Sequence, residues 1–223
     1  MSTDAKDVPR DHKYWDARFS EPGFAYGTGA NDFLRSVCAG LIPGDALSLG
    51  EGEGRNAVYL AKLGFSVTAV DFSEVGLEKA RELAAQHGVT ITTLLADLAD
   101  FDPGAERWDL VISIFAQPPS AIRKRLYGRI AQCLRAHGAF VLETKTQASA
   151  ADRYPGVDIL RTELQWVRFE IARGAERELN EGRYHRGVQR TAQILAFKGR
   201  NRAEQETGFV QAAATVQPRL ASS

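Results

Sequence analysis

One short stretch, residues 46–60, limits what this chain can fold into. Ala46–Leu49 is apolar enough for a buried strand, three alternating glycines then form a turn, and the run that follows has a helical period. Glycine is needed where a strand turns sharply into a helix and where a ligand must approach bare backbone. The unpaired amides at the start of such a helix suit an anionic group such as a carboxylate.

A second strand, Ser66–Asp71, ends in an acid about 20 residues further on, where folds of this kind hold ribose hydroxyls. The glycine spacing is G-x-G-x-G instead of the G-x-G-x-x-G of dinucleotide enzymes, and Glu51 and Glu53 lie in the turn. These acids disfavour a pyrophosphate and favour a phosphate-free nucleoside with a positive centre. S-adenosylmethionine fits that description. The alternative is an ordinary glycine turn without a ligand.

The sequence LSLGEGEGRNAVYLAKLGFSVTAVDFS resembles motif I and its continuation in the class I S-adenosylmethionine-dependent methyltransferases. Within it, GRNAVYLA resembles the tellurite-resistance (TehB-like) branch, and the resemblance runs from about Trp15 to Lys198. It implies an α/β fold with a Rossmann-like, doubly wound, seven-stranded, mostly parallel sheet whose last strand is antiparallel. It also implies S-adenosyl-L-methionine as the cofactor and S-adenosyl-L-homocysteine as its product, and it says much less about the substrate.

The resemblance also implies which residues contact the cofactor. Asp97 follows the third strand, where class I methyltransferases bind the adenine amino group; the alternative for Asp97 is a solvated loop acid. The full expected set is Gly50, Glu51, Gly52, Gly54, Asn56, Asp71, Phe72, Asp97, Leu98 and Phe115.

Two other segments are candidates for the substrate end. The N-terminal part carries Trp15 and a Tyr26-Gly27 stretch similar to one in the resembled family, although Ala30 replaces its proline. Gln117 follows a nearly unbroken apolar run that should form a central strand. Trp15, Tyr26 and Gln117 are therefore the expected substrate contacts, with simple packing as the alternative for Tyr26.

The resembled branch carries a His-Arg pair before its last strand, and His185-Arg186 matches it. By that match His185 would orient or deprotonate the substrate, and Arg186 would hold an anionic one. The alternative is an exposed hairpin pair without a role.

Composition excludes several classes of function. The 28 basic and 28 acidic residues balance, so nothing suggests attraction to nucleic acid or to an anionic membrane. The chain has no apolar run near ~20 residues and no signal-peptide core at its start, so we expect a cytoplasmic protein. Cys38 and Cys133 should be buried reduced thiols. The histidines lack metal-ligand spacing, and no metal is expected.

The chain divides into an N-terminal helical arm or lid (1–43), a cofactor-binding domain (44–199) and a flexible tail (200–223). One helix should run to about Arg135 with Arg123 on its solvated face, and a hairpin should close the sheet. The leading hypothesis is a methyltransferase, monomeric or homodimeric, for a small molecule or small oxyanion such as tellurite, selenite or a thiol. The alternatives are a nicotinamide-dependent oxidoreductase and a non-catalytic cofactor- or partner-binding protein.

Overall fold

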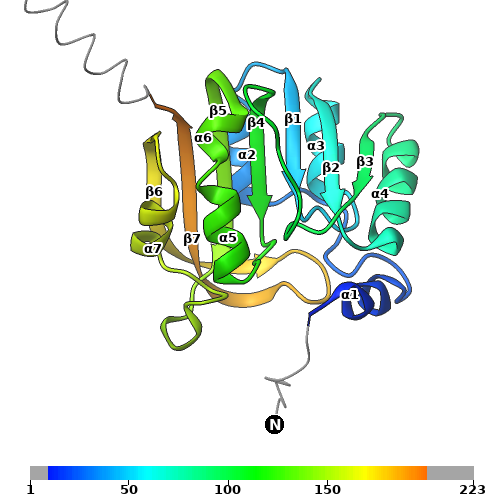
Figure 1. Cartoon of the computed structure of the whole chain (residues 1–223). Helices are drawn as coiled ribbons and strands as arrows, with labels where there is room; N and C mark the ends of the chain where they lie inside the picture. The colour runs from blue at the N-terminus through cyan, green and yellow to red at the C-terminus, as the bar shows by residue number, and fades with distance from the viewer. Residues whose placement is uncertain (1–9, 200–223) are drawn as a thin grey trace, which may run out of the picture.

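The computed structural model describes residues 10–199, in which a seven-stranded sheet lies between two layers of helices (Figure 1). The strands are β1 (Asp45–Leu49), β2 (Ser66–Asp71), β3 (Thr92–Leu95), β4 (Trp108–Ile114), β5 (Leu134–Lys145), β6 (Val167–Asn180) and β7 (Arg186–Lys198). The helices are α1 (His12–Phe19), α2 (Asp32–Cys38), α3 (Arg55–Lys62), α4 (Glu74–Gln86), α5 (Ser120–Tyr127), α6 (Ile130–Cys133) and α7 (Val157–Glu163), with a 3-10 turn at Ala148–Ala150.

The strand order is β3-β2-β1-β4-β5-β7-β6, and β7 runs opposite to the other six strands. This is the predicted doubly wound sheet with an antiparallel last strand. Apolar side chains of α2 and α3 cover one face, and those of α5, α6 and α7 cover the other. The central strand β4 is buried along almost its whole length, as its continuous apolar run predicts.

The parallel strands β1 to β5 all end at one edge of the sheet, and the strand order reverses between β1 and β4. Open α/β sheets bind ligands outside the carboxyl ends of their strands at such a reversal. The N-terminal helix α1 lies below this edge in Figure 1. The fold therefore places the glycine turn after β1, the acid after β2 and the N-terminal arm around one space.

The β6-β7 hairpin extends beyond the rest of the sheet. The register between β5 and β7 ends at the pair Lys145 and Thr191, whereas β7 continues to Arg186 against β6 alone. The predicted closing hairpin is confirmed, and its tip, residues 181–185, projects below the carboxyl edge of the sheet. Its protruding tip thereby reaches the same space as α1.

The sequence prediction was wrong for the segment before β5. The expected single helix is broken at Gly128 into α5 and α6, and β5 already begins at Leu134. Arg123 is not solvated but 2% exposed, because its guanidinium donates to both carboxylate oxygens of Glu163 on α7 (2.6 and 3.0 Å). This buried pair fixes α7 against α5.

Other expectations on the organisation of the chain have mixed outcomes. Cys38 and Cys133 are buried and unbridged, as expected. No helix within residues 10–199 is long and apolar enough to cross a membrane. The tail expected at 200–223 lies outside the described residues.

Candidate functional site

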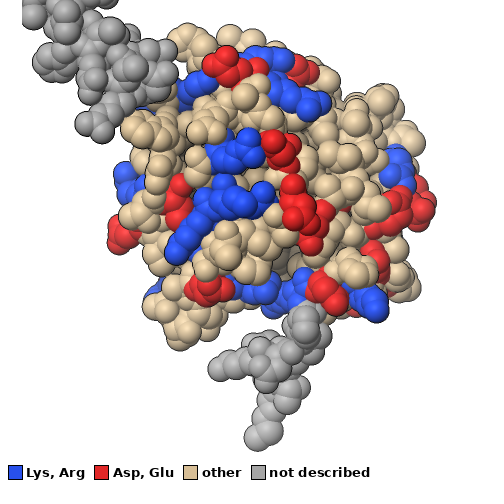
Figure 2. Space-filling view, in the orientation of Figure 1, with Lys and Arg blue, Asp and Glu red and all other residues tan. Residues whose placement is uncertain are grey.

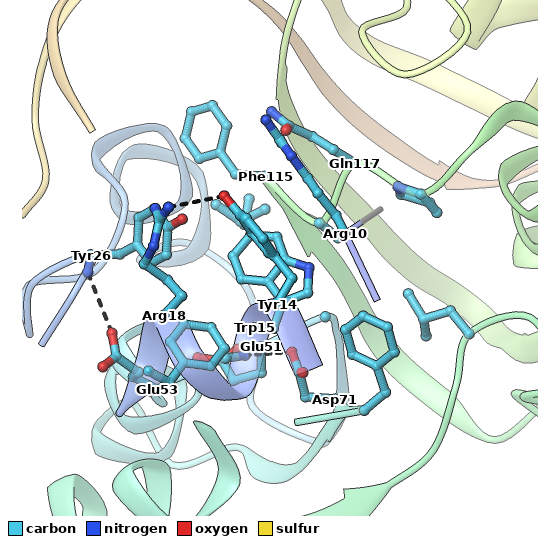
Figure 3. Close-up of a pocket in the computed structure, with 18 of the residues that line it drawn as sticks. Arg10, Tyr14, Trp15, Arg18, Tyr26, Glu51, Glu53, Asp71, Phe115 and Gln117 are labelled. Atoms are coloured by element: carbon cyan, nitrogen blue, oxygen red, sulfur yellow. Dashed lines mark hydrogen bonds between the residues drawn. The ribbon is translucent and has the colours of Figure 1, made fainter. Parts of the chain in front are cut away.

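A cavity of about 830 Å³ opens at the carboxyl edge of the sheet, between the glycine turn, α1 and the hairpin tip. Figure 3 shows side chains of the glycine turn, α1 and the segment after β4 converging on it. Most of the predicted site residues line it: Trp15, Tyr26, Gly50, Glu51, Gly52, Asn56, Asp71, Phe72, Asp97, Leu98, Phe115, Gln117 and His185. Gly54 and Arg186 are not among its lining residues.

The glycine turn does not leave all the amides of α3 to a ligand. Glu51 is 8% exposed, and its Oε1 accepts hydrogen bonds from the Asn56 and Ala57 amides (3.0 Å each), while Ser48 Oγ donates to its other oxygen. Burial raises the pKa of Glu51 against these donors. The expectation that these amides suit a ligand carboxylate is therefore wrong for Asn56 and Ala57, since a carboxylate of the chain itself caps the helix.

Asp71 stands at the tip of β2, where the sequence predicts it. The Gly52 amide donates to its Oδ2 (2.8 Å) and the Ser73 amide to its Oδ1 (2.9 Å), so the carboxylate also fixes the turn. Burial raises the pKa of Asp71 to about 6 despite these donors. Each carboxylate oxygen can accept a second hydrogen bond, which leaves acceptor capacity toward the cavity.

Gly54 supports the turn from outside the cavity. Its φ is +92°, and a Cβ there would lie 2.6 Å from Cα of Ala80 on α4. Glycine is required at this position for close packing of the turn on α4, and not for contact with a ligand.

Glu53 has a role that the sequence did not suggest. Its Oε2 accepts from the amides of Ala25 (2.8 Å) and Tyr26 (3.4 Å), and Lys79 of α4 donates to its Oε1 (3.1 Å). Glu53 thus ties the N-terminal loop to the glycine turn and holds Tyr26 over the cavity. Its position in the turn was the only sequence signal, and its partners lie far away in the chain.

The hairpin tip packs on the same loop. The Arg183 amide donates to the Ala25 carbonyl (2.9 Å), and a Cβ on Gly182 would lie 2.3 Å from the backbone nitrogen of Gly27. The φ of Gly182 is +83°, so both space and conformation require glycine there. The N-terminal loop and the hairpin therefore form one continuous wall of the cavity.

A buried charge network lies behind this wall. Glu143 at the end of β5 is fully buried; Arg177 (2.9 and 2.6 Å) and Asn31 (2.6 Å) donate to it, as do Thr191 and Gln193. Glu181 accepts from Arg177 (2.6 Å), Asn31 and Arg55 (2.8 Å). The network joins the arm, α3, β5 and the hairpin, and holds the segment that carries His185.

His185 lies between two aromatic rings on the cavity wall. Its ring centroid is 4.6 Å from that of Tyr26 and 4.5 Å from that of Phe115, and the residue is 8% exposed. Its Nδ1 is buried and has no hydrogen-bond partner among the described residues. Burial, with the charges of Arg55 and Lys145, lowers the pKa of His185 to about 3. The imidazole is therefore neutral near pH 7 and can exchange a hydrogen bond with a ligand.

This lowered pKa makes stability depend on pH. His185 becomes protonated below about pH 6.5 in the unfolded chain, but only near pH 3 in the folded chain. The unfolding free energy therefore decreases as the pH is lowered from about 6.5 to about 3. We expect the unfolding free energy of wild type, relative to His185→Phe, to drop by about 2 kcal/mol from pH 7 to pH 5. Urea unfolding of both proteins measures it. Asp71, whose raised pKa changes the unfolding free energy in the opposite direction, is present in both proteins, so its contribution cancels in the difference. A difference that is equal at both pH values would contradict a neutral buried His185.

The segment after β4 has a strained backbone beside His185. Phe115 (φ +54°) and Gln117 (φ +50°) both lie in the left-handed region, which costs energy for residues with a side chain. The buried Nε2 of Gln117 has no hydrogen-bond partner within the described part of the chain. Left-handed backbone and an unpaired buried donor are features that cluster in segments that contact ligands.

The structure separates the predicted His-Arg pair. Arg186 is exposed at the start of β7, and its Nε donates to the Gly182 carbonyl (3.0 Å). Five other cations line the cavity and were missed: Arg10, Arg18, Arg55, Lys145 and Arg153. Lys145 ends a parallel strand, which could have indicated it; Arg10 and Arg153 come from irregular segments without a sequence signal.

The comparisons with known proteins agree with this geometry. Residues 46–138 match the family model described as a methyltransferase domain. This segment is a methyltransferase domain. It contains the glycine turn, Asp71 and Asp97, and it ends before the hairpin.

Curated relatives match the methyltransferase domain over part of their own length. A 2-heptyl-1-hydroxyquinolin-4(1H)-one methyltransferase of Mycobacteroides abscessus is 28% identical over 47% of this chain and 48% of its own length. A probable S-adenosyl-L-methionine-dependent methyltransferase TehB of Haemophilus influenzae is 34% identical over 33% of this chain and 25% of its own. The matched region thus spans at most about half of these curated relatives.

Solved structures show the same fold over more of the chain. One, described under "Conversion of a Disulfide Bond into a Thioacetal Group during Echinomycin Biosynthesis", superimposes with a TM-score of 0.69 over 92% of this chain and 99% of that one, at 17% identity. At this identity the likeness concerns the fold alone. The methyltransferase domain therefore has the class I fold, including the strands beyond residue 138.

Proposed function

We propose that this protein transfers a methyl group from S-adenosyl-L-methionine to a thiol or hydroxyl of a small molecule. One observation carries the proposal. A single cavity has bare turn backbone and the Asp71 carboxylate at one end, and an unpartnered imidazole nitrogen of His185 at the other. Its volume, about 830 Å³, suits a nucleoside cofactor together with a small acceptor.

The residues at the first end fit the cofactor. Gly50 and Gly52 expose backbone, Asp71 keeps acceptor capacity for ribose hydroxyls, and Asp97 with Leu98 lines the space for an adenine. When bound, the cofactor supplies a methyl group on a positively charged sulfur, which is already a good leaving group. The chain has only to align the acceptor with that methyl and exclude water.

The second end suits a protic acceptor. The carbon–sulfur bond of the donor breaks as the bond from the acceptor's sulfur or oxygen to the methyl carbon forms, and the acceptor's proton passes to the His185 imidazole and then to water. Bond formation makes that proton strongly acidic, so even a weak base with a pKa of about 3 can accept it. Tyr26 stays protonated because burial raises its pKa to about 12. Its ring and that of Phe115 lie on either side of His185 and would enclose the reacting atoms.

The test is a turnover screen over thiols, phenols, halides, tellurite and selenite, with S-adenosyl-L-homocysteine as the readout and identification of the methylated product. We expect His185→Ala to lower kcat with the best acceptor about 100-fold, in line with the loss of one proton acceptor, while the Kd of S-adenosyl-L-homocysteine changes less than twofold.

His87→Ala is the matched control, because His87 is exposed at the end of α4 and does not line the cavity. Unchanged turnover in His185→Ala would remove His185 from the reaction. If no acceptor consumes the donor, a non-catalytic binding protein is favoured. Stabilisation by NADH but not by S-adenosyl-L-homocysteine would favour an oxidoreductase instead.

A further inference from the structure

Charged side chains of both signs line the cavity, and those that follow the strands differ in sign on the two sides of β4. The acids Glu51, Asp71 and Asp97 follow β1, β2 and β3, which lie side by side in the sheet. The cations Lys145 and Arg153 lie at the end of β5 and in the loop after it, on the opposite side of β4. Although the whole chain is neutral, the acceptor end of the cavity is basic.

Two of the cations that line the cavity have no carboxylate partner within residues 10–199. Arg18 donates to Tyr14 Oη (2.9 Å), and Arg55 pairs with Glu181 (2.8 Å). Arg10 and Arg153, by contrast, make no ion pair with any carboxylate in residues 10–199. A guanidinium without a carboxylate partner beside a cavity can pair with an anionic ligand, often through two parallel hydrogen bonds.

Neutral donors and aromatic rings complete this end. Arg10 and Gln117 both line the cavity, and the buried Nε2 of Gln117 lacks a hydrogen-bond partner among the described residues (Figure 3). Trp15, Tyr26 and Phe115 form the adjoining walls, with ring centroids of Trp15 and Tyr26 6.2 Å apart. Donors for an anion therefore lie next to flat apolar surfaces that suit a ring.

We propose that the acceptor is a small aromatic acid that carries the thiol or hydroxyl to be methylated. Its carboxylate pairs with Arg10 and Arg153, near Lys145, and its ring lies against Tyr26 and Phe115 with the nucleophile toward His185. The proposal rests on the proposed function, since it names the substrate class for the same cavity.

The experiment is calorimetry on the full chain saturated with S-adenosyl-L-homocysteine. The probes are 3-hydroxybenzoate, 4-hydroxybenzoate and thiosalicylate, each compared with its neutral amide. We expect at least one acid to bind at least tenfold more tightly than its amide. Arg10→Gln and Arg153→Gln should each weaken binding of that acid at least fivefold and change binding of the amide less than twofold.

Arg186→Gln is the matched control, because Arg186 is exposed and outside the cavity lining. Thermal unfolding checks that each variant is folded. The proposal is overturned if no acid binds better than its amide, or if the preference survives in the Arg10→Gln/Arg153→Gln double variant.

The same probes separate this proposal from the proposed function. Preferential binding of an acid without methyl transfer to any acceptor would leave the acid site standing and overturn the methyltransferase activity. Equal methylation of an acid and its amide, with equal affinities, would leave the methyltransferase activity standing and overturn the acid site.

Discussion

Asp71→Ala is expected to weaken binding of S-adenosyl-L-homocysteine about 100-fold. The carboxylate is 6% exposed, lines the cavity and retains acceptor capacity beyond the Gly52 and Ser73 amides. Hydrogen bonds to a charged group each contribute about 1.5–3 kcal/mol, so the loss of ribose contacts alone accounts for such a change. Isothermal titration calorimetry measures the Kd directly.

Two comparisons sharpen this experiment. Asp100→Ala removes an exposed acid in the same sheet-edge region that does not line the cavity, and its Kd should equal that of wild type. Since the pKa of Asp71 is raised to about 6 in the free protein, ligand hydroxyls that favour the ionised carboxylate should release protons on binding, and affinity should fall below about pH 6. Parent-like affinity in Asp71→Ala would place the nucleoside elsewhere.

Glu143→Ala is expected to destabilise the fold by about 3–5 kcal/mol. The side chain is fully buried and accepts hydrogen bonds from Arg177, Asn31, Thr191 and Gln193. Its removal leaves a partly buried guanidinium without one of its two main partners and several buried donors unsatisfied. Urea unfolding measures the change in unfolding free energy.

The control for Glu143 is an acid of the neighbouring β6-β7 hairpin whose ion pair is exposed. Glu170 on β6 pairs with Arg168 (2.8 Å), but both side chains are more than half exposed, so Glu170→Ala should change stability by less than about 0.5 kcal/mol. Equal effects of the two substitutions would show that the buried network contributes little. Glu143→Gln tests charge separately from shape, because it keeps most of the volume while it removes the negative charge.

Much of the fold followed from local sequence patterns. Asn31 and Ser73 stand directly before helical runs, and their side chains accept hydrogen bonds from the amides three residues on, as N-cap residues do. The apolar runs located the strands, and the glycines located the closing hairpin. Such signals act over a few residues, so a single sequence contains them in full.

The misses concern partners that lie far apart in the chain. Arg123 was predicted to be solvated because its partner Glu163 lies on another helix, and no role was predicted for Glu143, whose partner Arg177 lies 34 residues further on. Neither pairing leaves a local pattern. The break between α5 and α6 is different: Gly128 was visible in the sequence, but the apolar period on both sides of it outweighed that signal. In the candidate site, the residues expected to contact the cofactor line the cavity with the exception of Gly54, whereas the lining cations were not predicted.

The wall shared by the N-terminal loop and the hairpin has a consequence for how the catalytic chamber is assembled. The glycine turn, Asp71, Asp97 and Leu98 all lie within residues 46–98, but the opposite wall needs the contact of Gly182 with Gly27. During synthesis the wall that contains residues 181–185 of the hairpin is therefore the last part of the cavity to form. The hairpin wall can therefore vary in sequence while the glycine turn and the strand ends around it stay the same, which agrees with a family match that stops at residue 138.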